Sequence, residues 1–316
     1  MELQEVAKSG SARPDVPRSG ACCSELPESL GDDLLMFGGY TEDQSLNREA
    51  TNEAWVFSLA QDRWAQVACN APDAPRVRLA CGAVLVGNEV WVMGGWDPGH
   101  KRDGGSILQD IWALDLTTKS WRLVEPQGEK LPAISRFACA RIGTRVFLHT
   151  HRSTDSILVL DVADPKSPVL STVPVQASSQ DGVPPSRGLQ SLTAVGDQLY
   201  LYGGAPQKGP MLGDLWVLHT SCMQWELLHP KPAANGWTPH ARCSHGAAAL
   251  NGRIYFLAGS YYKDDGSGLQ PTAELFAYDI SSNQWHLLGD MEIVTGCPMG
   301  GIAQLLFLSA HCLSNA

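Results

Sequence analysis

The sequence predicts an all-β protein, folded as a β-propeller of about six blades with four antiparallel strands in each blade. The main observation is a cassette that occurs four times: an apolar run, a glycine pair or its equivalent, a second apolar run and a closing Trp. An aromatic residue of the second run always precedes the closing Trp by nine positions. These pairs are Trp55 and Trp64, Trp112 and Trp121, Trp216 and Trp225, and Phe276 and Trp285. Internal repeats of this kind indicate a repeated architecture.

The first apolar run of each copy has the length and composition of a short buried strand. These runs are Leu34–Phe37, Val90–Met93, Leu199–Tyr202 and Ile254–Leu257. The glycines that follow suit a tight turn, or a close approach of the backbone where a Cβ would clash. The second run is another strand. The closing Trp is too large for one four-stranded unit to bury, so we expect it to stack against the next unit.

In these features the chain resembles the kelch family, whose repeat of about 50 residues carries a glycine pair and a spaced aromatic residue and Trp. The likeness extends over nearly the whole chain, and four repeats keep both the turn and the Trp. It implies a kelch-type propeller. It says little about activity, because propellers of this type serve unrelated functions.

We expect one propeller domain over residues 1–316, with repeats at about 18–67, 75–124, 135–175, 185–230 and 240–288. The third repeat is degenerate, because Thr150 and His151 replace the glycine pair and Ser167 replaces the Trp. A degenerate blade with a changed loop is the simpler interpretation. A metal site at His149 and His151, on one strand face, is the alternative, but no nearby Cys, Asp or Glu completes a usual ligand set. The sequence therefore predicts neither a metal nor a cofactor.

The two ends predict how the ring closes. At a constant offset of 118 positions, Leu3 aligns with Trp121 and Arg18 aligns with Arg136. Residues 1–6 would then form the outer strand of a closing blade whose inner strands lie in residues 289–316. Pairing the ends would remove exposed strand edges. The sequence stops before a third strand of that blade, so either the blade is incomplete or the sequence is a truncated or mis-spliced product.

Charge and hydropathy exclude several classes of function. The net charge is −10, and no run of Lys and Arg forms the basic stripe that a nucleic-acid-binding protein usually carries. No stretch of about 18 apolar residues is present, so we expect no membrane span. The first residues include Glu2, Glu5 and Lys8 and form no apolar core of a secretory signal.

The nine cysteines are expected to be reduced structural thiols. No CxxC pair occurs, and Cys22 and Cys23 are adjacent and cannot chelate like a spaced pair. Cys81, Cys139 and Cys243 follow the starts of repeats, where we expect small buried residues on innermost strands. Reduced thiols are typical of a cytoplasmic protein.

Candidate binding residues lie where the loops of a propeller would gather around one mouth. Each repeat begins with an Arg near a Pro, and aromatic or acidic residues follow several glycine pairs. The candidates are Arg18, Tyr40, Arg76, Arg78, Trp96, Asp97, Arg136, His151, Arg187, Arg242, Tyr261 and Tyr262. Arginines and aromatic residues around one opening would suit an acidic peptide or one with a C-terminal carboxylate. Alternatively, each Arg pairs with backbone or with an acidic neighbour.

The sequence therefore predicts a non-enzymatic module that binds a partner protein or peptide. The alternative is an enzyme or a metal-assisted catalyst with a small-molecule site in the central mouth. The sequence contains no nucleophile elbow and no glycine-rich phosphate loop that would favour this alternative.

Overall fold

The computed structural model describes residues 18–26, 33–42, 48–61, 63–68, 74–99, 104–263 and 268–290. In these ranges the protein is all-β, as the sequence predicts, and contains no helix. The predicted closing blade lies almost entirely outside the described residues, since of residues 1–6 and 289–316 only 289 and 290 are described. The described residues also contain no helix that could span a membrane.

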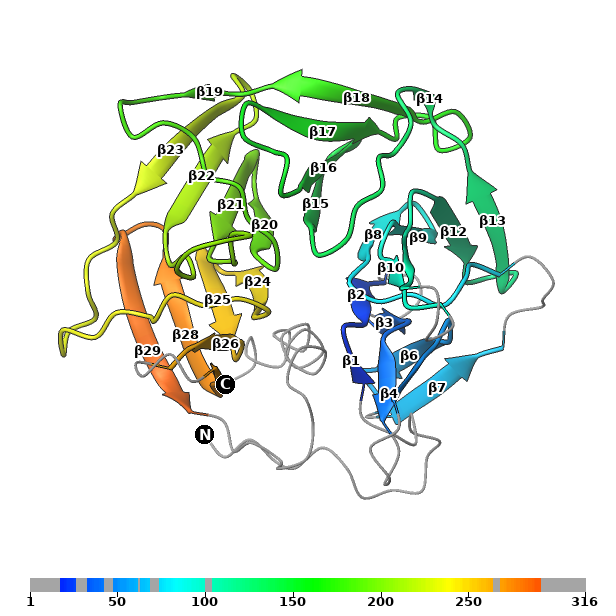
Figure 1. Ribbon diagram of the computed structural model, residues 1–316, viewed down its shortest axis with the longest axis horizontal. Coiled ribbons are helices and arrows are strands. Elements are labelled where there is room, and N and C mark those ends of the chain that lie inside the picture. Colours follow the sequence, from blue (N-terminus) through cyan, green and yellow to red (C-terminus); the bar gives the residue numbers. More distant parts are fainter. Residues whose placement is uncertain are drawn as a thin grey trace.

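Five four-stranded antiparallel sheets follow one another along the chain and surround a common centre (Figure 1). Sheet 1 contains β2 (Cys22–Glu25), β3 (Leu34–Phe37), β6 (Ala54–Ser58) and β7 (Arg63–Val67). Sheet 2 contains β8 (Gly82–Val86), β9 (Glu89–Met93), β12 (Ile111–Asp115) and β13 (Ser120–Val124). Sheet 3 contains β15 (Ala138–Ile142), β16 (Arg145–His149), β17 (Ser156–Asp161) and β18 (Val169–Pro174).

Sheets 4 and 5 repeat the same up-and-down order. Sheet 4 contains β20 (Ser191–Val195), β21 (Gln198–Tyr202), β22 (Leu215–His219) and β23 (Gln224–Leu228). Sheet 5 contains β24 (Gly246–Leu250), β25 (Arg253–Leu257), β28 (Glu274–Asp279) and β29 (Gln284–Asp290). The first strand of each sheet lies nearest the centre (Figure 1), and contacts between these innermost strands join sheet 1 to sheet 5 through sheets 2, 3 and 4.

Two sheets gain a fifth strand, which the repeat pattern does not predict. β14 (Gln127–Gly128) pairs in parallel with β18, and β19 (Gln176–Ala177) pairs in parallel with β23. Each is part of the connection that leaves the outermost strand of one sheet and enters the next sheet. The connection therefore covers the outer edge of the sheet it leads to, which removes an unpaired strand edge.

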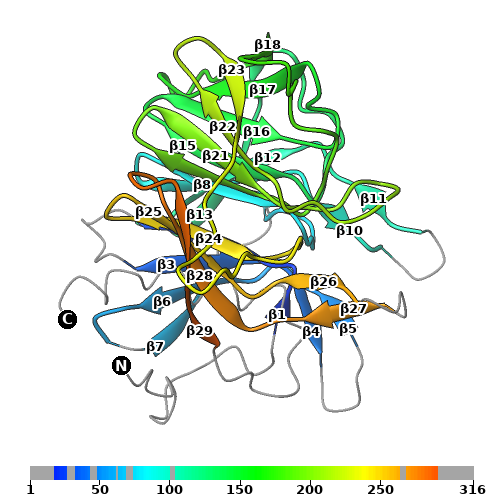
Figure 2. The ribbon, with the colours of Figure 1, turned by 90° about the vertical axis from the view of Figure 1, so that its left-hand side faces the viewer.

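Three small ribbons project from the same side of the ring (Figure 2). Each contains a strand that begins directly after the glycine turn of sheet 1, 2 or 5, at Tyr40, Trp96 or Ser260. The first contains β1 (Arg18–Ser19), β4 (Tyr40–Glu42) and β5 (Arg48–Ala50); the second contains β10 (Trp96–Asp97) and β11 (Ser106–Ile107); the third contains β26 (Ser260–Tyr262) and β27 (Leu269–Pro271). We call this end of the ring axis the mouth.

The hydrophobic core lies between neighbouring sheets, and the closing Trp residues belong to it. Trp121 packs edge-on against Phe37, with ring centroids 5.0 Å apart, and Trp285 packs against Tyr202 at 5.5 Å. Each buried Trp thus stacks against the sheet that precedes its own, instead of the next unit as the sequence suggests. Burial of about 150–250 Å² per Trp contributes roughly 4–6 kcal/mol to the contact between two sheets.

Candidate functional site

A chain of backbone hydrogen bonds joins the five sheets at the mouth. It runs through the residue two positions before each innermost strand. These residues, which we call the belt, are Gly20, Ala80, Arg136, Leu189 and Ser244. Each backbone N–H donates to the carbonyl of the preceding member, at 2.8, 2.9, 2.8 and 2.9 Å in order along the chain.

Every belt residue has a left-handed backbone, with φ between +52° and +71°. Four of the five are not glycine, and a left-handed backbone costs such residues about 1–2 kcal/mol each. The repeated conformation therefore has a structural purpose, since it aims each N–H at the neighbouring sheet. The belt is a rigid backbone frame around the mouth.

Four of the candidate arginines lie inside the sheets, behind the belt. Arg78 is fully buried and binds both carboxylate oxygens of Asp110, at 2.7 and 3.0 Å. Its guanidinium also donates to the carbonyls of Gly94 and Arg76, at 3.0 and 3.1 Å. The indole N–H of Trp112 donates to the same Asp110 at 2.8 Å. This arrangement satisfies a buried charge with an ion pair and with backbone acceptors.

The same arrangement recurs in sheets 1, 4 and 5. Its members are Arg18 with Glu53 and Trp55, Arg187 with Asp214 and Trp216, and Arg242 with Glu274. In sheet 5 an aromatic ring replaces the indole donor, and the guanidinium carbon of Arg242 lies 4.6 Å from the centroid of Phe276. These four arginines therefore pair with an acidic neighbour and with backbone, and their side chains are enclosed.

Electrostatics support this pairing. Burial opposes ionisation of Asp110 and Asp214, but hydrogen bonds and the charge of Arg78 and Arg187 outweigh it, and the pKa of each carboxyl is lower than usual. Each acid is therefore ionised at neutral pH and holds its Arg in place.

Arg136 does not belong to this set, and the alignment of Arg18 with Arg136 is wrong by two positions, because Gly20 is the residue equivalent to Arg136. The strands of sheet 3 follow those of sheet 2 at an offset of 56 residues, from β8 to β15 and from β9 to β16. At that offset Ile134 takes the place of Arg78, and its carbonyl accepts from Gly95 as the carbonyl of Arg78 accepts from Gly39. Arg136 takes the place of Ala80 in the belt. Arg18 and Arg136 agree in residue type but differ in their position relative to the strands.

Sheet 3 has no counterpart of the buried Arg–acid pair, because the residues at all of its positions differ. Ile134 is fully buried where Arg78 lies in sheet 2, while Ser156 and Leu158 correspond to Asp110 and Trp112. The loop that follows β16 is also short, with six residues (150–155) against twelve (203–214) in sheet 4. An apolar residue in place of a buried cation removes the need for a buried acid. The loop of sheet 3 is the shortest of the five that join the second and third strands, and we call this part of the mouth the low rim.

Exposed cations line this low part of the rim. Arg136 and Arg152 are exposed, and His151 is half-buried. Burial and the charge of Arg152 lower the pKa of His151, so the imidazole is neutral at pH 7. Burial raises the pKa of Cys243, and a hydrogen bond of Ser244 and the positive charge of Arg136 partly offset this rise. Since Cys243 belongs to the entrance of sheet 5, the Arg136 charge acts on a group two sheets away.

The remaining candidates lie on the ribbons. Tyr40 and Trp96 follow the glycine pairs of sheets 1 and 2, and their rings meet edge to face with centroids 6.5 Å apart. Arg76 is 62% exposed and pairs with the buried Asp97 at 2.7 Å. On the third ribbon, Tyr261 stacks on His240 at 4.7 Å and Tyr262 is half exposed. The structure thus places these residues and Arg136 around one mouth.

The histidines of the suggested metal site are not gathered with other ligands. His149 is buried against Trp225, with ring centroids 5.8 Å apart, and its Nδ1 lies 3.2 Å from the Gln190 amide nitrogen. Over the described ranges, no group of three or more His, Cys, Asp or Glu side chains is placed to hold a metal ion.

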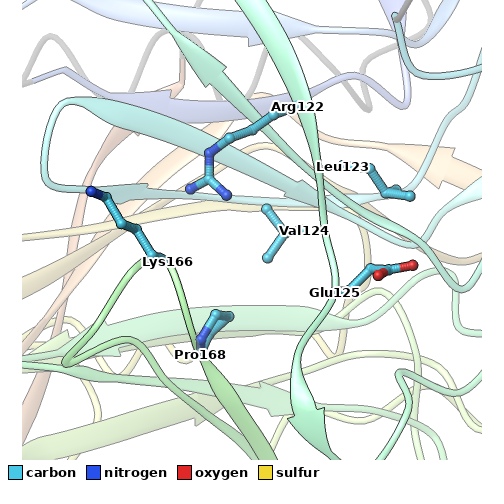
Figure 3. A pocket seen from close by; sticks show the side chains of 6 residues that line it. All are labelled: Arg122, Leu123, Val124, Glu125, Lys166 and Pro168. Carbon is cyan, nitrogen blue, oxygen red and sulfur yellow. The ribbon is translucent and has the colours of Figure 1, made fainter.

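A shallow hollow of about 480 Å³ lies at the outer edge of the ring, between sheets 2 and 3 (Figure 3). Its lining comes from β13 and from the turn between β17 and β18, and consists of Arg122, Leu123, Val124, Glu125, Lys166 and Pro168. Arg122 is held by two bonds to Glu89, at 2.8 and 2.6 Å, and lies over the ring of Trp91. The turn from β17 to β18 is at the end opposite the mouth, so this hollow is separate from the candidate site.

Comparisons with known proteins agree with this architecture. The chain is 28% identical over 290 residues to multiple epidermal growth factor-like domains protein 8 of Mus musculus, which covers 85% of this chain and 9% of that protein. It is 25% identical over 238 residues to the leucine-zipper-like transcriptional regulator 1 homolog of Drosophila melanogaster, covering 73% of this chain and 23% of the relative. A third relative is acyl-CoA-binding domain-containing protein 4 of Arabidopsis thaliana, 26% identical over 259 residues, with 78% of this chain and 35% of the relative covered.

The matched region is thus about a tenth to a third of each of these relatives. The KLHDC2/KLHL20/DRC7 Kelch-repeats domain matches residues 1–150 and 149–295, which is nearly the whole chain. Together with the ring of four-stranded sheets and the repeated glycine turns, this match shows that the chain belongs to the Kelch-repeat domain family.

Proposed function

We propose that this Kelch-repeat domain binds an acidic segment of a partner protein at its mouth, with the low rim over sheet 3 as the point of entry. Kelch-repeat domains generally mediate protein–protein interactions and generally serve as non-enzymatic scaffolds. Binding residues are commonly placed on loops that a rigid scaffold holds in position. Here the belt provides that scaffold.

The observation that carries the proposal is the position of Arg136. It is the one charged member of the belt, whose other members are Gly20, Ala80, Leu189 and Ser244. Its side chain is exposed, and no ion pair holds it among the described residues. A guanidinium can donate two parallel hydrogen bonds to a carboxylate, which suits either an acidic side chain or a C-terminal carboxylate.

The aromatic residues of the ribbons support a peptide as the ligand. Tyr40 and Trp96 form a preassembled edge-to-face pair beside the mouth. Aromatic side chains and Arg are enriched among the residues that dominate binding energy, because they bury much area and lose little conformational freedom. A peptide could place an acidic group on Arg136 and apolar groups on this pair.

The negative charge of the whole chain should direct an acidic segment to the cations at the mouth. The net charge is −10, so an acidic partner is repelled from most of the surface. Arg136 and Arg152 offer a local exception over sheet 3. Opposite charge at one place and like charge elsewhere is expected to orient an acidic segment.

The test is a selection from a displayed library of random peptides with free C-termini, followed by fluorescence polarisation with the enriched peptides. We expect acidic peptides, and at least tenfold weaker binding to Arg136→Ala. Lys119→Ala is the matched control. Lys119 is also an exposed cation with a left-handed backbone (φ +53°), but it lies in the β12–β13 turn at the opposite end of the sheet.

Amidation of the peptide C-terminus separates the two sources of the carboxylate. Loss of binding on amidation would identify a C-terminal carboxylate, and retained binding would identify an acidic side chain. Enrichment of uncharged peptides, or equal affinity of Arg136→Ala and Lys119→Ala, would contradict the proposal.

A cytoplasmic location is part of the proposal. Its support is the set of free thiols in the described ranges, of which Cys22, Cys81 and Cys243 are buried and Cys222 is exposed. A reducing compartment keeps such thiols unpaired. Fractionation of cells that express the tagged chain tests this, and recovery in the secreted fraction would contradict it.

A further inference from the structure

Two buried thiols meet at the seam between sheets 1 and 2. Cys22 is the first residue of β2, and Cys81 is the residue between the belt member Ala80 and β8. Their sulfur atoms are 3.1 Å apart, although the residues are 59 positions apart in the chain. Both side chains are buried, with 4% and 8% of their surface exposed. Cys81 thus lies before the innermost strand on which the sequence places it.

The two other cysteines in this region form no thiol–thiol hydrogen bond with Cys22 or Cys81. Cys139, on β15 of sheet 3, directs its thiol to the carbonyl of Ala83 at 3.7 Å. Cys23 is next to Cys22, but alternate residues of a strand point to opposite faces. The geometry therefore singles out one pair, Cys22 and Cys81.

The separation of the two sulfurs is favourable for bond formation. A disulfide bond is about 2.05 Å long, so the atoms need to approach by only about 1 Å. The innermost strands β2 and β8 are in contact, so the two cysteines lie on, or directly before, neighbouring strands.

The two thiols also differ in acidity, which gives them different roles. A hydrogen bond with Cys22 and the charge of Arg78 lower the pKa of Cys81 in spite of burial, whereas the same hydrogen bond and burial raise the pKa of Cys22. Cys81 is therefore the thiol that ionises first. The thiolate is the nucleophilic form of cysteine.

We propose that Cys22 and Cys81 form a redox couple that a hydroperoxide converts into a disulfide joining sheet 1 to sheet 2. The Cys81 thiolate attacks the peroxide, so that an S–O bond forms, the O–O bond breaks and the leaving oxygen departs as water or alcohol after taking a proton. Cys22 then attacks the sulfenic acid sulfur of Cys81. The S–S bond forms, the S–O bond breaks, and hydroxide leaves as water with the Cys22 proton.

The disulfide would lie next to the mouth and could therefore affect its geometry. Leu79, two residues before Cys81, bridges to Trp96, and Cys22 follows Gly20 of the belt by two residues. Oxidation would fix the first two sheets to each other beside the Tyr40 and Trp96 pair. The reduced couple leaves this seam held by packing and hydrogen bonds alone.

The experiment treats the reduced full-length protein with hydrogen peroxide, blocks free thiols with iodoacetamide and maps tryptic peptides without reduction. The sequence is favourable, because Cys81 and Cys139 fall in separate peptides, 79–101 and 137–141, and Cys22 falls in 19–48 with Cys23. We expect a cross-link between 19–48 and 79–101 that dithiothreitol reverses. The link should persist in Cys23→Ser and in Cys139→Ser, and disappear in Cys22→Ser.

Two results would overturn the proposal, and both come from the wild-type chain. One is a cross-link of 79–101 to 137–141. The other is an unmodified Cys81 in protein whose exposed Cys222 has been oxidised. The oxidised wild type should also melt at a higher temperature than the reduced protein, since a disulfide restricts the unfolded chain. No such increase should occur in Cys22→Ser.

Discussion

The guanidinium of Arg187 binds both carboxylate oxygens of Asp214, at 2.6 and 2.7 Å, and joins the entrance of sheet 4 to the residue directly before its third strand. Arg187 is fully buried, so its charge depends on this partner. Asp214→Asn should lower the free energy of unfolding by about 3–5 kcal/mol, because it leaves a buried cation without its counter-ion.

Urea denaturation measures this effect, with Arg253→Gln as the control. Arg253 also pairs with an acid, Asp279 at 2.8 Å, but the Arg side chain is well exposed. Exposed pairs contribute little. Similar midpoints for the two variants would show that the internal pair is not needed for the stability of sheet 4.

The stability of the protein should decrease between pH 7 and pH 5 because of two buried histidines. Burial, with the charge of Arg187 or Arg242 nearby, lowers the pKa of His149 and of His245 to about 3. The unfolded chain takes up protons below its ordinary pKa of about 6.5, whereas the folded chain does not. Stability is therefore complete above about pH 6.5 and is lost as the pH falls toward 3, by up to about 2 kcal/mol per histidine at pH 5.

Urea denaturation midpoints at pH 7 and at pH 5 test whether stability decreases on acidification. His245→Phe keeps a ring against Tyr202 and Phe256, whose centroids lie 5.1 and 5.9 Å from that of His245. The variant should lose less stability on acidification than the wild type, whatever its stability at pH 7. An unchanged pH dependence would mean that His245 is not held neutral.

The closing Trp residues should differ in importance. Trp225 is 1% exposed and packs against His149 of the preceding sheet, so Trp225→Ala should cost about 3–5 kcal/mol. Trp64 is partly buried and packs on Phe57 of its own sheet, at 5.1 Å. Trp64→Ala should therefore cost much less. Chemical denaturation compares them, and equal losses would argue against stacking between sheets as the source of stability.

Alanine at the second glycine of a pair should be poorly tolerated. Gly95 has φ +104°, and a Cβ there would lie 2.9 Å from the Cβ of Cys81 and 3.0 Å from the carbonyl oxygen of Leu79. Gly87 also has a left-handed backbone, but a Cβ would meet nothing within 4 Å. Gly87→Ala should cost about 1–2 kcal/mol, and Gly95→Ala about 1–3 kcal/mol more because of overpacking. Comparison of the melting temperatures of the two variants separates the cost of backbone strain from the cost of steric overlap of the new Cβ.

Much of the fold could be predicted from the sequence, because the signals are local. An apolar run followed by glycines, and a Trp nine residues after an aromatic residue, identify strands and their order without reference to distant residues. The position of Trp237 shows the limit of such local evidence. It lies outside the repeated cassette, in a Pro- and Gly-rich connection, so the repeat pattern assigns it no partner, yet it is half-buried and packs edge-on against Phe276 at 5.5 Å.

The site was harder to predict, because its geometry depends on strand register and on backbone atoms. A sequence cannot distinguish an Arg that points into a sheet, such as Arg78, from an exposed one two positions later, such as Arg136. The signal that separates them is the constant 56-residue offset between the strands of sheets 2 and 3. The belt could not be recognised from residue types, because its bonds are formed by backbone N–H and carbonyl groups.

That property of the belt has a consequence for how the protein can change. Because no side chain contributes to the four bonds, a substitution at a belt position alters the chemistry presented at the mouth and leaves the connection between sheets in place. The new residue must keep a backbone N–H, which excludes proline, and must accept a left-handed backbone, as glycine and, less readily, asparagine and aspartate do. The connection between the five sheets therefore depends on the backbone atoms of these residues, whereas the surface at the mouth depends on their side chains. In a protein with such a frame, a single substitution can change the surface at the mouth without breaking a hydrogen bond between two sheets.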